Sequence, residues 1–391
     1  MLFQIKSKSE DFVVEEILPE WIPSWKWDFL YIFFEKENLT TMDIVDDLTK
    51  NFHLQRDELG IAWLKDKAWI TRQWISISKR SLDKIWGEDL FTKALWEKVR
   101  IIEKSYNESW LKVASNQWNN FKIYLCARQK ISDEIKTQIE SNVQKIRERW
   151  FPNCFWMQRF WKWKKNFYEA KERLQKLAKE YREKWKLKES DLPYHLRFLL
   201  QAYPSMYFNE YALSRWEKWL FLLQWDILVD RFNSNWVRTA VYDSQKIYEF
   251  DYQKLKKEKV DLNLFEPNIS DKCDDFDMDK WFPTWPMIWW NLLLPLEWSK
   301  ARVRDNQLLS LAEFDVWMQQ VCKIYNLWWV RRALFIKVPD LKFEWNNDDI
   351  KLEFFLPTWS YATTLISFIL QWVDYLTLKD NSLVIPRISN K

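Results

Sequence analysis

A charged triplet between two apolar runs is the part of this chain whose residue types could do chemistry. Lys65, Asp66 and Lys67 stand in GIAWLKDKAWITRQWISIS, residues 60–78, which ends in alternating isoleucine and serine. The alternation is typical of a half-buried strand, so the triplet lies on a connection just before a sheet element. Catalytic residues are frequent on such connections, and an ionised aspartate there could act as a nucleophile. A solvated turn without function would give the same pattern.

The elements that must position this triplet are strands and helices in mixed order. Residues 10–18, 28–36 and 121–127 have the pattern of strands. Thr40 or Thr41 can cap a helix, and its apolar stripe is Met42, Val45, Leu48 and Phe52. Further helices are expected from Ser132 onward, over 167–181, 199–213 and 308–325, and a strand over 351–356. This order predicts an α+β fold.

The composition has almost no glycine and an excess of tryptophan. The chain has 2 Gly and 30 Trp in 391 residues, whereas ordinary usage would give roughly 27 Gly. Many of the tryptophans stand in polar, Pro-flanked places where turns use glycine, as in Pro283-Thr284-Trp285-Pro286. We therefore hypothesise that UGA codons, read as glycine in the organism, have been translated as tryptophan. We expect most of nine positions to be glycine, namely Trp25, Trp27, Trp63, Trp118, Trp156, Trp161, Trp225, Trp285 and Trp359.

Length, charge and cysteine usage narrow the class of protein further. A chain of 391 residues suggests two domains. With a net charge of +4, binding to a polyanion would depend on local basic patches. The four cysteines show no CxxC pair and only two histidines are present, which argues against a metal site or a disulfide framework. Since no long apolar run is found, we expect a soluble, cytoplasmic protein that does not bind membranes. We also expect it to be a monomer.

Several separated motifs resemble one family. With glycine at Trp63 and Trp69, the first stretch becomes GIAGLKDKAGITRQW, which is similar to the signature of the tRNA pseudouridine synthase D (TruD) family. FPNCFWMQRFWKWKKNF at 151–167 and WFPTWPMIWWNLLLP at 281–295 resemble two further family segments, and LPTWSYATTL at 356–365 resembles a third. The resemblance covers nearly the full length in the family's order.

This resemblance implies a fold, a domain order and an activity. A pseudouridine synthase catalytic domain with a mixed or antiparallel sheet would comprise residues 1–162 and 331–391, interrupted by an inserted α/β TRUD domain at 163–330. The protein would be an isomerase that turns one uridine of tRNA, at position 13 in the D-arm, into pseudouridine. The reaction exchanges no electrons and transfers no phosphate, so no cofactor or metal is expected.

The resemblance also assigns the residues of the site. Asp66 matches the family's nucleophile. The sequence is compatible with attack of its carboxylate on the sugar and with attack on the base. The substrate-binding residues would be Phe12, Asn119, Phe121 and Tyr361 around the flipped base, with Lys65 beside the nucleophile and Gln158 and Arg159 at RNA phosphates. We expect the first four to form one pocket with Asp66, although each alone has an ordinary structural interpretation in a strand, a turn or a helix start.

Two other functions remain open at this point. A catalytically inactive RNA-binding protein of the same fold would retain most of these features, although an aspartate at position 66 argues against it. A carbohydrate-binding protein could use tryptophans as platforms for sugar rings. That interpretation needs the tryptophans on one face, and they are spread along the whole chain.

Overall fold

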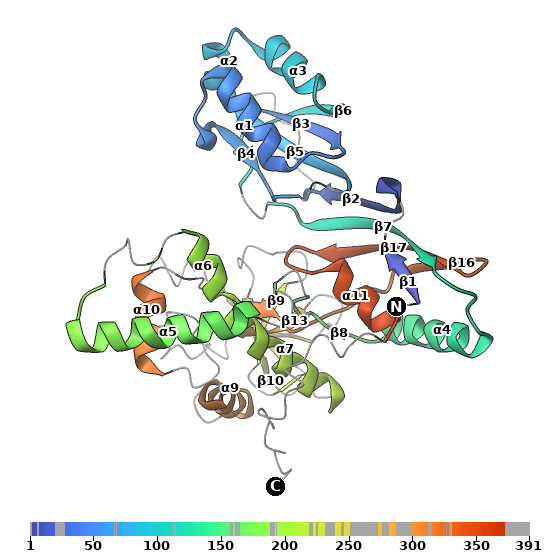
Figure 1. The fold of residues 1–391 in the computed structure, drawn as a ribbon, viewed down its shortest axis with the longest axis vertical. Helices are drawn as coiled ribbons and strands as arrows, with labels where there is room; N and C mark the ends of the chain where they lie inside the picture. Colours follow the sequence, from blue (N-terminus) through green and yellow to red (C-terminus); the bar gives the residue numbers. More distant parts are fainter. Residues whose placement is uncertain are drawn as a thin grey trace. The chain divides into compact units, whose positions relative to one another are not determined.

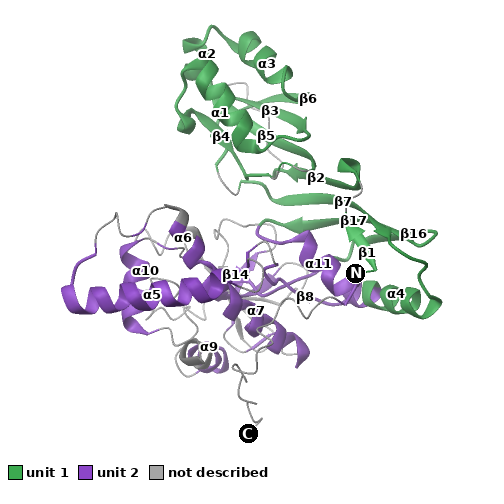
Figure 2. Cartoon of the chain, in the orientation of Figure 1, with its two compact units in different colours: residues 1–143, 338–358 green, residues 144–337, 359–391 purple. Residues whose placement is uncertain are grey.

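Strands from both ends of the chain share one nine-stranded sheet in the first of two compact units, which contains residues 1–143 and 338–358 (Figures 1 and 2). The second unit contains residues 144–337 and 359–391. The computed structural model describes residues 2–5, 8–19, 28–65, 67, 69–112, 115–156, 159–160, 165–187, 192, 194–218, 222–223, 226–230, 239–243, 246–250, 273–275, 281–286, 299–311, 315–325, 327 and 331–371.

The sheet of the first unit is mostly antiparallel. Its main path runs β16-β17-β7-β2-β5-β3-β6, with β1 paired to β7 and β4 paired to β5. Only β2 and β5 pair in parallel among these strands, which makes the sheet mixed. The strands are β1 (Phe3–Ile5), β2 (Phe12–Ile17), β3 (Phe29–Lys36), β4 (Leu59–Ile61), β5 (Ile70–Ser78), β6 (Arg100–Asn107), β7 (Trp118–Ala127), β16 (Lys342–Asn346) and β17 (Asp349–Pro357).

Three helices pack on one face of the β3–β5 part of this sheet (Figure 1). They are α1 (Thr41–Phe52), α2 (Lys79–Lys84) and α3 (Glu88–Trp96). Thr40 is the N-cap of α1, with a capping box to Asp43 that satisfies the first free N–H groups of the helix. The buried side chains Ile44 and Leu48 then face Ile75 and Ile77 across one core. The remaining elements are 3-10 turns at Ser9–Asp11 and Arg56–Glu58, and α4 (Asp133–Glu148), which ends in the second unit.

The predicted half-buried character of β5 is wrong. Ile75 and Ile77 face the helices as expected, but Ser76 on the opposite face is also buried. A second small core covers that face, formed by Tyr31, Phe33, Ala62, Trp74 and Leu111. The Ser76 hydroxyl accepts a hydrogen bond from the Leu111 N–H at 3.3 Å, so a polar side chain can lie in this covered position.

The second unit combines a six-stranded sheet with helices. The strand order is β12-β11-β10-β9-β13-β14, and β15 pairs separately with β8. The strands are β8 (Phe151–Pro152), β9 (Ile227–Asp230), β10 (Thr239–Asp243), β11 (Lys246–Phe250), β12 (Cys273–Asp275), β13 (Trp281–Pro286), β14 (Arg331–Ala333) and β15 (Phe335–Ile336). The helices are α5 (Lys165–Lys184), α6 (Tyr194–Leu200), α7 (Ala202–Glu217), α9 (Lys300–Leu311), α10 (Val316–Ile324) and α11 (Ala362–Ile369).

The α+β prediction is confirmed, and two predicted helices are divided. The helix expected over 199–213 is α6 followed by α7. The helix expected over 308–325 is α9 and α10, because Asp315 caps a new helix with its side chain accepting from the Met318 N–H. The division into 1–162 with 331–391 and an insertion at 163–330 stays a prediction, since the compact units have other boundaries.

Within the described ranges, tryptophan occupies three backbone positions that favour glycine. Trp86, Trp185 and Trp359 have φ values of 68°, 52° and 71°, the left-handed region in which side chains other than glycine cost energy. Trp86 follows the end of α2, where the Gly87 N–H bonds to the Leu82 carbonyl at 2.9 Å. Trp185 follows α5, with its N–H on the Tyr181 carbonyl at 2.7 Å. Both bonds are those of helix ends that use glycine at this position.

The nine tryptophans named in the sequence analysis do not all have a left-handed backbone. Trp359 has the expected positive φ, whereas Trp118 and Trp285 are buried within strands. Trp63 and Trp156 are partly buried. The others lie outside the described residues: Trp25, Trp27, Trp161 and Trp225. The recoding hypothesis therefore stays a prediction, supported by the helix ends.

We expect Trp86→Gly to stabilise the protein by about 1 kcal/mol, because it removes the left-handed strain of a bulky residue. The indole is 88% exposed, so little packing is lost. Trp96, which is 64% exposed but lies at the end of α3 outside the left-handed region, is the matched control. Trp96→Gly should destabilise by about 0.5–1 kcal/mol. Urea unfolding of the two variants measures the difference, and equal destabilisation by both would contradict the glycine interpretation.

Candidate active site

The Lys65 side chain points into the first unit instead of into solvent. Its Nζ donates to Asn119 Oδ1 at 2.5 Å and lies 3.4 Å from Glu16 Oε1. The side chain is only 9% exposed and the Glu16 side chain 1%. Asn119 Oδ1 also accepts from Asn116 Nδ2 at 3.4 Å. The first lysine of the triplet is therefore part of a buried polar cluster.

Sheet register brings these partners together. Glu16 of β2 stands directly opposite Asn119 of β7, and Glu16 Oε2 accepts from the Trp74 N–H of β5 at 3.2 Å. Burial raises the pKa of the Glu16 carboxyl, while the Lys65 ammonium, the Trp74 N–H and the Lys36 ammonium oppose that rise. A buried carboxylate is tolerated only with such compensating partners.

The backbone of Lys65 is held by the first turn of α1. The Lys65 N–H donates to Thr41 Oγ1 at 2.8 Å, and the Thr41 N–H reaches the Lys65 carbonyl at 3.4 Å. Thr41 Oγ1 in turn donates to Gln73 Oε1 of β5 at 3.0 Å. The chain that leads into position 66 is thus fixed at its backbone and at its side chain.

An aromatic group lies at the start of β2. The Phe12 ring stacks on Trp69 with centroids 4.2 Å apart and meets Phe121 of β7 edge-on at 6.1 Å. Phe121 stacks on Phe354 of β17 at 5.4 Å. Phe12 and Phe121 are both buried, so three strands bring together two of the predicted pocket residues.

The predicted nucleophile, Asp66, lies outside the described residues. So does Gln158, one of the predicted phosphate contacts. The pocket expected to join Asn119 with Asp66 stays a prediction, and Asn119 contacts Lys65. Lys67, in contrast, is exposed.

Tyr361 belongs to the second unit, where it precedes α11. Its ring lies 5.8 Å from that of Phe155, and the Arg332 guanidinium lies 5.5 Å from its centroid. Arg332 is buried over the Phe155 ring at 4.1 Å and donates to Asn153 Oδ1 at 3.0 Å. Burial lowers the pKa of Arg332 to about 10, opposed by Tyr361. The sequence does not indicate that Arg332 packs against Tyr361, because it shows only a second arginine beside Arg331.

Arg159 is buried, which does not favour the predicted contact with phosphate. Its Nε donates to Ser205 Oγ at 3.1 Å and its Nη2 to Gln201 Oε1 at 2.8 Å, both at the start of α7. Its carbon Cζ lies 5.3 Å from the Phe155 ring. Burial lowers the pKa of Arg159. This environment favours a structural role, and the phosphate contact stays a prediction.

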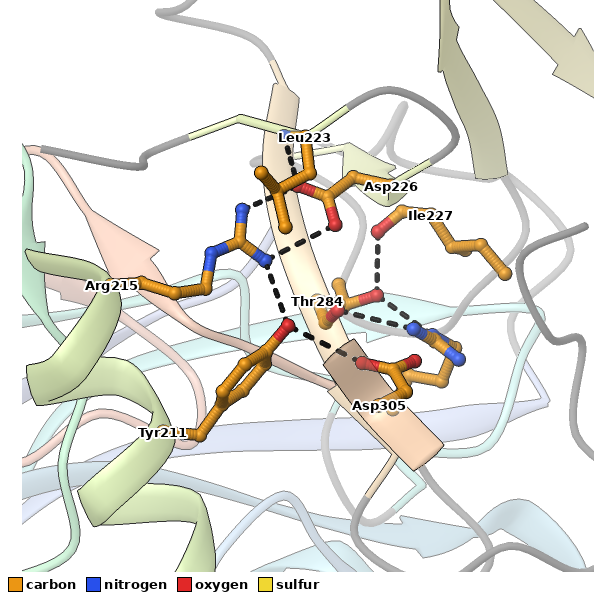
Figure 3. Close-up of polar contacts among 8 residues, drawn as sticks. Tyr211, Arg215, Leu223, Asp226, Ile227, Thr284 and Asp305 are labelled. Carbon is orange, nitrogen blue, oxygen red and sulfur yellow. Dashed lines mark hydrogen bonds and ion pairs between the residues drawn. The ribbon is translucent and has the colours of Figure 1, made fainter. Parts of the chain in front are cut away.

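A second buried polar cluster lies in the second unit (Figure 3). Arg215 of α7 forms a two-point ion pair with Asp226, with Nη2–Oδ2 at 2.5 Å and Nη1–Oδ1 at 3.1 Å. Tyr211 links Arg215 to Asp305, to which its hydroxyl donates at 3.3 Å. Burial raises the pKa of Asp305 to about 7, opposed by Arg331. Since every polar group drawn belongs to this unit's interior, we interpret the cluster as structural.

The described part of the chain contains neither a cluster of metal ligands nor a membrane-spanning helix. No three histidine, cysteine, aspartate or glutamate side chains there come together as a metal site would require. None of the helices described above is long and apolar enough to cross a membrane.

Comparison with known proteins finds one family to which this chain is similar. The model of the family described as tRNA pseudouridine synthase D (TruD) matches residues 2–174. A relative of that name from Thermus thermophilus is 24% identical over 93% of this chain and 87% of its own length. Another from Campylobacter jejuni is 25% identical over 93% and 91%, and one from Sulfurimonas denitrificans is 30% identical over 40% and 42%.

The fold agrees with these sequence matches. The crystal structure of a candidate tRNA pseudouridine synthase D from Methanosarcina mazei superimposes with a TM-score of 0.58 at 17% identity. The match covers 94% of this chain and 93% of that chain. The family model, the relatives that span nearly the whole chain and the fold therefore agree, and this chain is similar to tRNA pseudouridine synthase D (TruD) proteins over most of its length.

Proposed function

We propose that this protein is a tRNA pseudouridine synthase that uses Asp66 as its nucleophile and acts on the uridine at position 13. The observation that carries the proposal is the buried cluster of Lys65, Glu16 and Asn119, since it fixes the residue directly before Asp66. A solvated turn without function would not need a lysine held in this way.

The reaction needs little beyond positioning and one carboxylate. The bond from N1 of uracil to C1′ of the ribose breaks, the base turns over, and a bond from C5 to C1′ forms. C5 loses a proton and N1 gains one, so substrate and product are isomers. An aspartate can engage the sugar or the base covalently, or stabilise the charge that develops when the first bond breaks.

The described residues offer suitable surroundings for a base taken out of its stack. Phe12 and Phe121 supply apolar rings within one group, and Asn119 lies on the same strand as Phe121. Flipped bases are held by stacking and by hydrogen bonds to their edges. Since Lys65 faces inward and Lys67 is exposed, we assign contact with RNA phosphate to Lys67. Tyr361 and Gln158 are further proposed substrate contacts.

The proposal also assigns a role to each of the two predicted domains. Residues 1–162 and 331–391 would form the catalytic domain and residues 163–330 an inserted domain that helps to bind tRNA. The shared nine-stranded sheet supports the first part, because β17, which follows residue 331, pairs with β7, and β16 extends the sheet beyond β17.

Pseudouridine mapping on tRNA transcripts tests the proposal. The purified protein should convert a single uridine, at position 13, as detected by carbodiimide modification and reverse transcription. A transcript with cytidine at position 13 should gain no pseudouridine anywhere. Conversion at another site would overturn the assigned position. Binding of tRNA without any conversion would favour the catalytically inactive RNA-binding protein.

A further inference from the structure

Glu16 is a buried carboxylate at the junction of three strands. It belongs to β2, stands opposite Asn119 of β7, and accepts a hydrogen bond from the Trp74 N–H of β5. Only 2% of the residue is exposed, so it cannot contact a bound RNA. Removing a carboxylate from water is costly unless a cation and hydrogen-bond donors compensate.

Lys65 is the cation nearest to this carboxylate. Its Nζ lies 3.4 Å from Glu16 Oε1 and donates to Asn119 Oδ1 at 2.5 Å. One side chain therefore contacts the two residues that face each other across the β2–β7 pair. The backbone of Lys65 is held independently by Thr41, so the carboxylate acts on the direction of the side chain.

We propose that Glu16 is a positioning residue that holds the Lys65 ammonium against Asn119 and so fixes the geometry of the chain entering Asp66. The inference rests on the proposed function, in which Asp66 is the nucleophile. Without the carboxylate, the Lys65 ammonium is free to leave Asn119 and turn toward the negative charge of its neighbour in sequence. Asn119 then loses the shorter of the two contacts on its amide oxygen and retains the one from Asn116 at 3.4 Å.

The charges around Glu16 are consistent with this role. Burial raises the pKa of the carboxyl, and the cations facing it are Lys65 from the connection before β5 and Lys36 from β3. The Lys36 ammonium is itself buried and donates to the Leu39 carbonyl at 2.8 Å. The ionised carboxylate therefore depends on Lys65, and the orientation of Lys65 depends on the ionised carboxylate.

Glu16→Gln is the direct test, because it keeps the shape and an acceptor for the Trp74 N–H but removes the charge. We expect kcat for pseudouridine formation to fall about 10- to 100-fold through misplacement of the reacting groups. KM and the Kd for tRNA should stay within about twofold, since the residue does not contact RNA. The matched control is Glu15→Gln on the other face of β2, where Glu15 pairs with Arg72 at 2.8 Å. The kcat of this control should equal that of the unaltered protein.

A double-mutant cycle and a pH profile separate positioning from mere structural support. If Glu16 acts through Lys65, the variant with both Glu16→Gln and Lys65→Met should lose no more activity than Lys65→Met alone. This double variant also removes both buried charges, so it offers a folded alternative if Glu16→Gln does not fold. In the unaltered protein, kcat should fall at acid pH as Glu16 is protonated, and in Glu16→Gln that decline should move to lower pH.

The outcomes distinguish this inference from the proposed function. If Glu16→Gln or the double variant matches the unaltered protein while Asp66→Asn is inactive, the inference is wrong and the proposed function stands. The inference would also be wrong if the losses of activity from Glu16→Gln and Lys65→Met were additive. It would be wrong as well if the fall of kcat at acid pH occurred at the same pH in Glu16→Gln as in the unaltered protein. If the unaltered protein forms no pseudouridine, the proposed function itself fails.

Discussion

Replacing Asp66 with asparagine should abolish pseudouridine formation and leave tRNA binding intact. Asparagine keeps the size of the side chain and its hydrogen-bonding capacity, but its amide is uncharged and is not a nucleophile. Loss of an activated nucleophile lowers kcat by about 10⁴-fold or more in other enzymes. Binding should persist because affinity for RNA comes mainly from contacts with phosphates along the backbone.

The measurement is pseudouridine mapping on tRNA incubated with each protein, together with the Kd for the same transcript. Asp57→Asn is the matched control, because Asp57 is an exposed aspartate in the same unit. Its activity should equal that of the unaltered protein. Undiminished modification by Asp66→Asn would move the chemistry to another residue, and loss of tRNA binding would show that the substitution disturbs more than the reaction.

Local periodicity predicted most of the elements around the site. The strand patterns of residues 10–18 and 28–36 correspond to β2 and β3, and the stripe after Thr40 corresponds to α1. The stripe of α1 predicts a helix because one face of it meets the core. The continuous apolar run of β3 predicts a strand, and this strand is covered on both faces. The division between α9 and α10 was missed although Asp315 is a typical N-cap residue, since the surrounding apolar positions continue the helical period.

The environment of Lys65 depends on pairings that periodicity does not show. Its partners, Glu16 and Asn119, lie 49 and 54 positions away in sequence, on strands whose register places them opposite each other. One signal was available: Phe12, Val14 and Glu16 alternate on one face of β2, so a core face that carries Phe12 also carries a glutamate. A charge in such a position predicts a buried partner of opposite sign.

Arg159 is a residue for which the sequence predicted an exposed position and the structure shows a buried one. It precedes Lys162, Lys164 and Lys165 in the sequence, a run that is typical of an exposed basic surface. In the structure its guanidinium is buried against Gln201 and Ser205 of the α7 start. Composition alone cannot separate a buried arginine from an exposed one, because both need only a polar partner within reach of a long side chain.

The second large expected effect concerns the buried ion pair between Arg215 and Asp226 (Figure 3). The two side chains are 0% and 3% exposed. Asp226 Oδ2 also accepts from the Leu223 N–H at 2.8 Å, so the carboxylate ties the end of α7 to the segment that leads into β9. Burial acts to lower the pKa of Arg215, but Asp226 and Tyr211 outweigh it and the pKa rises, which indicates a strongly favourable pairing.

Arg215→Met should destabilise the second unit by about 3–5 kcal/mol, because it leaves the Asp226 carboxylate buried without its cation. Methionine retains an apolar side chain of similar length, so the loss is mainly electrostatic. Hydrogen exchange reports such local effects when the two units unfold separately. Amides of α7 and β9 should exchange about 10²- to 10⁴-fold faster, while those of α1 and β3 should be unchanged.

Two further variants test whether the unpaired Asp226 carboxylate causes the faster exchange in Arg215→Met. Adding Asp226→Asn to Arg215→Met removes the buried charge and keeps an acceptor for the Leu223 N–H, so exchange in α7 should slow again relative to the single variant. Arg56→Met breaks an ion pair of similar length, 2.8 Å to Asp46, in which the arginine is 68% exposed. It should leave exchange unchanged, because exposed pairs contribute little. If the second substitution brings no recovery, the loss in Arg215→Met comes from packing around Tyr211 and Phe335, over whose rings the guanidinium lies.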